Sequence, residues 1–154
     1  MQTVKSQIVL FIVMFFLALT LNPMNILAHK IDDVYLSLTL IYSALFMASN
    51  MIWSHQIVHY LSYNKMNSTF FWVGCILSLI SSVLLRFQFE VRGEQWLKRM
   101  IGHHSTAITT TQQLLNDAEN FRDNPKLYRL AKDIVYSQQR EILFMKGFLQ
   151  NHFA

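Results

Sequence analysis

The chain has 154 residues, of which 53% are hydrophobic and only 14% are charged, and its formal net charge is +4. An ordinary soluble domain carries about 25% charged residues, so this composition excludes a disordered chain and most simple soluble domains. Only six of the charged side chains precede residue 90. The sequence therefore predicts an apolar region at 1–89 and a water-compatible domain at 90–154.

The apolar region predicts three transmembrane helices, at about 6–27, 34–57 and 69–88. A spanning helix needs about 20 mostly apolar residues, and the one charged side chain in these segments is Arg86, near the end of the third. Asn22 and Pro23 should kink or end the first helix, because proline disfavours helical backbone before it. Lys5 before the first segment also resembles the start of a secretory signal, and we interpret this segment as an uncleaved anchor.

The orientation in the membrane stays open at this point. The side that carries the C-terminal domain has more Lys and Arg residues, which places it in the cytoplasm by the positive-inside rule. A signal anchor leaves the N-terminus inside, and three spans then place the C-terminal domain on the outer side. Cys75 is the one cysteine, which excludes a disulfide within the chain.

The C-terminal region predicts an antiparallel helical hairpin with helices at about 93–118 and 125–152, because apolar residues recur there at helical spacing. Asn124 and Pro125 are typical of a helix start, as cap and first helical residue. Two helices are half of a four-helix bundle. We therefore expect a homodimer or a larger membrane complex to cover their remaining apolar faces.

A turn centred near Phe121 sets the register of this hairpin. Polar and sulfur-bearing side chains then face one another in its middle. The candidate metal ligands are Met100, His103, His104, Glu141 and Met145, with Gln138 as a secondary candidate. Thioether with imidazole favours copper(I), whereas imidazole with carboxylate suits copper(II), zinc or iron. In the alternative interpretation, the histidine and glutamate form a structural hydrogen bond and the methionines fill the core.

A second stripe of histidine and methionine lies on the second predicted span. Met47, Met51, His55 and His59 follow at four-residue steps, so they share one helix face. This stripe could be a path for a soft metal or for protons, because ionisable groups at membrane depth are often functional. We favour an interpretation in which the methionines pack and the histidines lie at the headgroup level. His29 is the better extra ligand, because it shares the hairpin's side of the membrane.

Two blocks of the C-terminal region resemble a bacterial family, the ferritin-like domain of unknown function 305. The first block is Met100-Ile101-Gly102-His103-His104 followed by Ala107-Ile108. The second contains Asp123-Asn124-Pro125, Leu130-Ala131, Ile134, Glu141-Ile142, Met145 and Phe148-Leu149. One branch of this family has three spans before the domain, and Val34-Tyr35 and Val73-Gly74 resemble its second and third spans.

The resemblance implies a small, exported helical-bundle domain that binds copper or silver through Met and His in some relatives. By position, the matching residues are Met100, His103, His104, Glu141 and Met145. The chain departs from the metal-handling pattern at Thr106 and Thr110, where such relatives often carry further methionines. The resemblance favours a periplasmic hairpin attached to the bacterial inner membrane.

No catalytic motif, phosphate-binding loop or basic stripe occurs in the sequence, so we expect no enzyme, no nucleic-acid partner and no small-molecule substrate. The expected partners are the lipid bilayer and either a second copy or a larger complex. The expected function is metal binding, with copper as the expected cofactor, in copper handling or tolerance. The alternative is a structural or accessory subunit of a membrane complex that binds no metal.

Overall fold

The computed structural model describes residues 4–153, and every regular element in this range is helical, which confirms the all-α prediction there. The elements are α1 Val4–Thr20, α2 Pro23–Ile26, the short 3-10 helix η1 Ile31–Asp33, α3 Leu38–Tyr63, α4 Ser68–Phe87, α5 Gly93–Leu115, η2 Ala118–Phe121 and α6 Pro125–His152. They form two compact units. The first contains the chain up to Asn22 together with Leu38–Val91, and the second contains Pro23–Ser37 together with the chain from Arg92.

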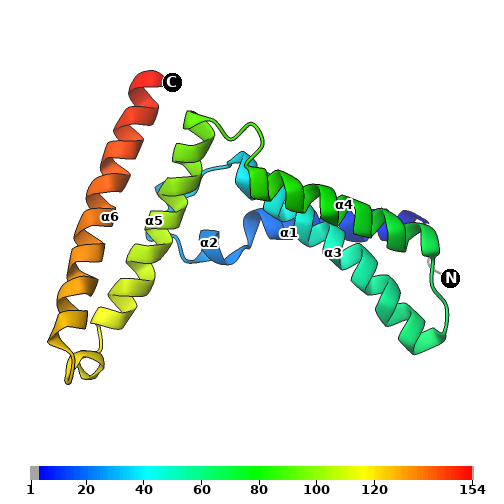
Figure 1. Ribbon diagram of the computed structural model, residues 1–154, viewed down its shortest axis with the longest axis horizontal. Coiled ribbons are helices and arrows are strands. Elements are labelled where there is room, and N and C mark those ends of the chain that lie inside the picture. The colour runs from blue at the N-terminus through cyan, green and yellow to red at the C-terminus, as the bar shows by residue number, and fades with distance from the viewer. Residues whose placement is uncertain (1–3, 154) are drawn as a thin grey trace. The chain divides into compact units, whose positions relative to one another are not determined.

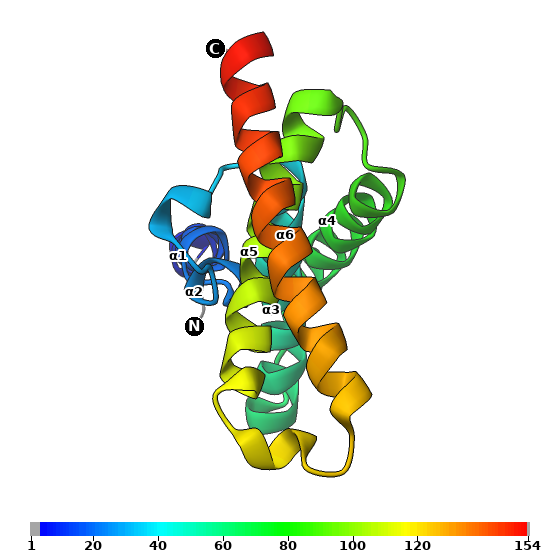
Figure 2. The same cartoon turned by 90° about the vertical axis from the view of Figure 1, so that its left-hand side faces the viewer.

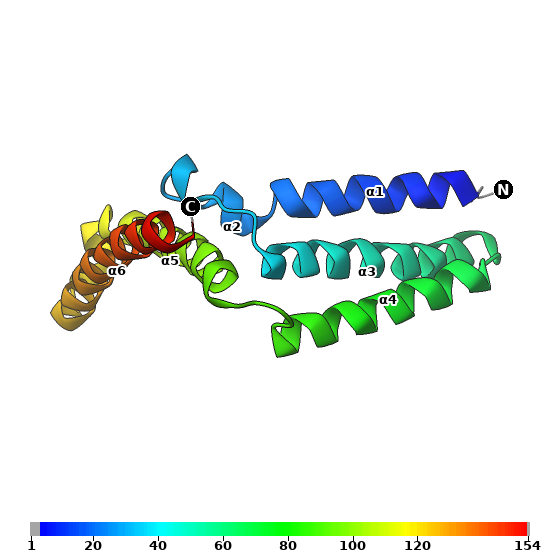
Figure 3. The same cartoon turned by 90° about the horizontal axis from the view of Figure 1, so that it is seen from above.

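In the first unit, α3 packs between α1 and α4 (Figure 3). The contact between α3 and α4 is close because small residues line it. A Cβ atom on Gly74 would lie 2.8 Å from the backbone nitrogen of Trp53, so only glycine fits without a shift. Ala48 and Ser49 are fully buried on the α3 side. Small residues at such contacts are typical of helices that pack in membranes.

Polar side chains inside the first unit are paired with one another. Asn50 Oδ1 accepts hydrogen bonds from Trp53 Nε1 at 2.9 Å and from Ser78 Oγ at 2.7 Å. Gln56 is fully buried, and its Nε2 donates to Gln7 Oε1 on α1 at 3.1 Å. Burying a polar group without a hydrogen bond costs free energy. These hydrogen bonds therefore allow polar side chains of α3 to be buried against α1 and α4.

Two helical stretches in the described residues, Val4–Ile26 and Ser68–Phe87, are long and apolar enough to cross a membrane. They correspond to the first and third predicted spans. The second predicted span, 34–57, overlaps α3 but was placed too early, since α3 begins at Leu38 and ends at Tyr63. α3 does not reach the same apolar content because of its Ser, Asn, Gln and His side chains. The break expected at Asn22 and Pro23 is present, since α1 ends at Thr20 and α2 begins at Pro23.

In the second unit, α5 and α6 lie side by side and run in opposite directions (Figures 1 and 2). Their buried core consists of Leu97, Ile101, Ile108, Ile142, Met145 and Leu149. α6 begins at the predicted cap, where Asn124 Oδ1 accepts from the Leu127 backbone at 3.2 Å. α5 ends at Leu115, three residues before the expected 118, because the chain continues into a turn and η2. Asn120 Nδ2 closes that turn on the carbonyl of Leu114 at 3.2 Å.

The connector Pro23–Ser37 packs against α5 and α6, although the sequence assigned it to the apolar region 1–89. Met24 provides two of the contacts. Its carbonyl accepts from Thr106 Oγ1 at 3.2 Å, and its sulfur accepts from the Arg99 guanidinium. The water-compatible domain is therefore a helix pair completed by a segment from between the first two apolar segments.

Candidate metal centre

Four of the five candidate metal ligands line one pocket in the second unit. Met100 and His104 lie one turn apart on α5, and Glu141 and Met145 lie one turn apart on α6. Residues at this spacing share a helix face, so each helix presents one pair to the other. The pocket has a volume of about 460 Å³, and its other lining residues are Trp96, Leu97, Arg140 and Phe144.

His104 is the central polar group of this pocket. Its Nδ1 lies 3.1 Å from Oε2 of Glu141, a contact within the register expected from the turn. The His104 side chain is 12% exposed, whereas that of Glu141 is 48% exposed. Although the two groups are close, the buried Nδ1 has no hydrogen bond of acceptable geometry among the described residues. Buried nitrogen atoms without such a partner are rare in folded proteins and are often found at functional sites.

Burial lowers the pKa of His104 below its ordinary value of 6.5. The carboxylate of Glu141 acts in the opposite direction, and the neighbouring His103 lowers the pKa further. Because burial outweighs the carboxylate, the imidazole is neutral at pH 7. A neutral imidazole keeps a nitrogen lone pair, which is the form that binds a metal ion.

His103 and Gln138 do not line this pocket. The His103 side chain is exposed, and its ring centroid lies 6.0 Å from that of His104. Adjacent residues on a helix point about 100° apart, so only one of the two histidines can face α6. Gln138 has a buried Oε1 with no hydrogen-bond partner among the described residues.

The donor types in the pocket favour a soft ion. In the part of the chain that the structure describes, no three His, Cys, Asp or Glu side chains gather to hold a metal. A structural zinc site usually has four such ligands, and this pocket offers two. The remaining donors are the thioethers of Met100 and Met145, of which Met145 also belongs to the buried core. One imidazole, one carboxylate and two thioethers are most compatible with copper(I).

The secondary candidates on α3 lie in the other unit. Met47 is exposed, and Met51 is half-buried. His55 Nδ1 lies 3.4 Å from Gln7 Nε2, and His59 Nδ1 lies 2.6 Å from the carbonyl of Lys65. These contacts give both histidines a local role within the first unit. His29 lies in the second unit and lines a different pocket.

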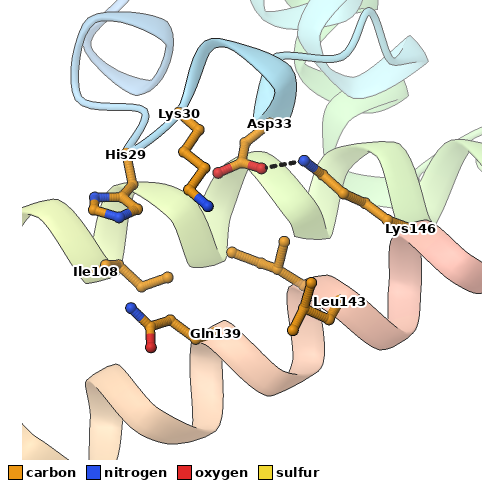
Figure 4. A pocket seen from close by; sticks show the side chains of 8 residues that line it. His29, Lys30, Asp33, Ile108, Gln139, Leu143 and Lys146 are labelled. Atoms are coloured by element: carbon orange, nitrogen blue, oxygen red, sulfur yellow. Dashed lines mark ion pairs between the residues drawn. The ribbon is translucent and has the colours of Figure 1, made fainter.

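A buried carboxylate that the sequence analysis missed joins the connector to both long helices. Asp33 is 2% exposed, and its Oδ2 accepts from Ser105 Oγ on α5 at 2.6 Å. Its Oδ1 lies 2.6 Å from Nζ of Lys146 on α6. The dashed line in Figure 4 marks this ion pair. Ser105 is fully buried and its Oγ also accepts from the backbone N–H of His29 at 2.7 Å. The only sequence signal for this carboxylate was a pair of aspartates between two apolar segments.

We expect Lys146→Met to destabilise the second unit by about 3 kcal/mol, because the substitution leaves a buried carboxylate without its cation. This value is at the lower end for a broken buried pair, since Lys146 is 23% exposed and its position admits some water. The free energy of unfolding can be measured from amide hydrogen exchange of α5 and α6 in the full-length protein. Lys146→Arg should retain most of the stability, and Asp33→Asn combined with Lys146→Met should recover part of it. Wild-type exchange rates in Lys146→Met would contradict the assignment.

Comparison with known proteins places the C-terminal unit in a family. Residues 84–152 match the model of a domain of unknown function, DUF305. The chain is also 33% identical over 145 residues to an uncharacterized protein of Acanthamoeba polyphaga mimivirus, covering 94% of this chain and 92% of that protein. No solved structure shows significant similarity. Residues 84–152 of the chain therefore form a DUF305 domain.

Proposed function

We propose that this chain is a membrane-anchored protein that binds copper(I) in its α5–α6 hairpin, in copper handling or tolerance. The ligands are His104, Met100 and Met145, and Glu141 is an additional carboxylate at the exposed side of the pocket. The observation that carries the proposal is the buried imidazole nitrogen of His104. Its Nδ1 lies 3.1 Å from Glu141 Oε2 without an acceptable hydrogen-bond geometry, and the side chain shares a pocket with two thioethers.

The sulfur donors account for the preference for copper(I) over zinc or copper(II). Thioethers are soft, neutral ligands, and they bind copper(I) without needing to lose a proton. The lowered pKa of His104 also favours metal binding, because near neutral pH fewer protons compete with the ion for the imidazole nitrogen. When bound, the ion supplies one soft cation that holds α5 and α6 together.

We further propose that the chain crosses the membrane three times, with α3 as the second crossing. The connector and the α5–α6 pair share a buried ion pair between Asp33 and Lys146, which supports placing both on the same side of the membrane. The number of crossings between Ser37 and Arg92 is then even. Since α4 is apolar enough to cross, α3 must cross as well. Its polar residues are compatible with this position because Asn50 and Gln56 are paired with side chains of α4 and α1.

Single cysteines in a Cys75→Ser background should test this topology with a thiol reagent that does not cross membranes. Ile31 in the connector is 84% exposed and Tyr136 on α6 is 69% exposed, so Ile31→Cys and Tyr136→Cys are suitable positions. Both should react from the same side, and Lys65→Cys in the exposed turn before α4 should react from the opposite side. Labelling of all three from one side would contradict three crossings.

We also propose a cellular compartment for the chain and a protein partner for its α5–α6 hairpin. The family resemblance supports a bacterial inner membrane with the hairpin on the periplasmic side, although the curated relative belongs to a virus. Two helices also make half of a four-helix, ferritin-like bundle. Phe144 on α6 is 71% exposed beside the pocket of His104, which supports a second copy or a larger membrane complex as the cover for this face.

The copper site should be tested by titrating the full-length protein in neutral detergent with copper(I), using a competing chelator to measure the dissociation constant. Wild type should bind one ion per chain. His104→Gln and Met100→Leu should each weaken binding by at least about tenfold, because each removes a ligand while nearly conserving side-chain volume.

Two variants serve as matched controls. His103→Gln removes an exposed histidine beside the site, and Met47→Leu removes an exposed methionine in the first unit. Neither should change the dissociation constant. Equal losses in His103→Gln and His104→Gln would contradict the assignment. Absence of copper binding in a folded wild type would instead favour the structural or accessory subunit, in which His104 and Glu141 only hold the two helices together.

A further inference from the structure

A second pocket of the α5–α6 unit lies beside the connector and is independent of the candidate copper site. It has a volume of about 270 Å³. The lining residues are His29, Lys30, Asp33, Ile108, Gln139, Ile142, Leu143 and Lys146 (Figure 4). Ligand pockets usually have volumes of about 300–1,000 Å³, so this one suits a small molecule or one group of a larger molecule.

The charges around this pocket favour an anion. Lys30 and Lys146 provide two ammonium groups, and Asp33 is the one acidic residue among the lining side chains. The carboxylate of Asp33 is already engaged on both oxygens, by Ser105 and by Lys146. No ion pair involves Lys30 within residues 4–153, so its charge is not balanced locally. Because Asp33 and Lys146 neutralise each other, Lys30 supplies the excess positive charge of the lining residues.

The neutral lining residues add hydrogen-bond donors and an apolar wall. Figure 4 shows the imidazole of His29 beside the side chain of Lys30, and the side-chain amide of Gln139 on the other side of Ile108. Ile108 and Leu143 supply apolar surface to the lining. Several donors from two separate segments suit an anion with three or more acceptor oxygens, and lysine is a common ligand of phosphate.

We propose that this pocket binds a phosphate group carried on an apolar body. Lys30 and Lys146 contact the phosphate, His29 and Gln139 donate to its remaining oxygens, and Ile108 and Leu143 contact the carbon atoms attached to it. A soluble phosphate ester and a phospholipid headgroup have this chemistry in common. The proposal does not rest on copper binding, because none of these residues lines the pocket of His104.

Butyl phosphate is a suitable soluble probe, and it should be titrated into the metal-free, full-length protein in a phosphate-free detergent by calorimetry. One molecule should bind per chain. Lys30→Glu and Gln139→Glu should each weaken binding by at least about tenfold, because each places a carboxylate at the phosphate position. Both positions are exposed, so the fold should be retained, and circular dichroism can check this.

Lys126→Glu is the matched control, because Lys126 is exposed on the same unit but outside the pocket. It changes the net charge as Lys30→Glu does and should leave the dissociation constant unchanged. Displacement of butyl phosphate by short-chain phosphatidic acid would identify a lipid headgroup as a source, whereas tight binding of butyl phosphate without such displacement would identify a soluble ester. Equal weakening in Lys126→Glu, equally tight binding of pentanoate, or no binding of either phosphate probe would overturn the proposal.

Discussion

The buried carboxylate of Asp33 is the interaction on which the second unit depends. A charged group that is 2% exposed loses nearly all of its hydration, and it is stable only if other groups replace the water. Ser105 supplies a hydrogen bond from α5, and Lys146 supplies a cation from α6. A single side chain of the connector is therefore bonded to both long helices. This arrangement explains why the connector, α5 and α6 form one compact unit.

The connector also explains how a small domain reaches a stable core. Two helices alone bury little apolar surface, and small domains usually need a further source of stability. Tyr35 of the connector packs against the core that Leu97 and Ile142 help to form, and Met24 contacts α5 through its carbonyl and its sulfur.

The pocket beside the connector and the candidate copper site use different faces of α6. Gln139 and Lys146 line the pocket beside the connector, whereas Glu141 and Met145 line the pocket of His104. A helix turns about 100° per residue, so these two sets point about 130° apart.

Local signals in the sequence were sufficient to predict the long helices and some of their ends. Pro23 and the Asn124 cap act through the backbone of adjacent residues, so the break after α1 and the start of α6 could be predicted from a few positions. The register of the α5–α6 pair followed from the length of its turn. That predicted register placed His104 near Glu141, and the two side chains lie 3.1 Å apart in the structure.

The parts that the sequence did not predict depend on contacts between distant residues. Asp33 and Ser105 are 72 positions apart, and no periodic pattern links a connector to a helix so far along the chain. Which of His103 and His104 lines the pocket also depends on contacts between distant residues. Both fit the spacing, and only the packing of α5 against α6 decides that His104 faces the pocket while His103 is exposed. The polar residues of α3 are a third case, because their hydrogen bonds to α1 and α4 appear only in three dimensions.

X-ray absorption spectroscopy of the copper(I)-loaded protein identifies the atoms bound to the ion. We expect a spectrum with sulfur scatterers together with nitrogen, since Met100, Met145 and His104 line one pocket. The sulfur contribution should decrease when Met100 and Met145 are both replaced by leucine. A spectrum with nitrogen and oxygen scatterers alone, or one that is unchanged in the double leucine variant, would rule out copper(I) binding by Met100 and Met145.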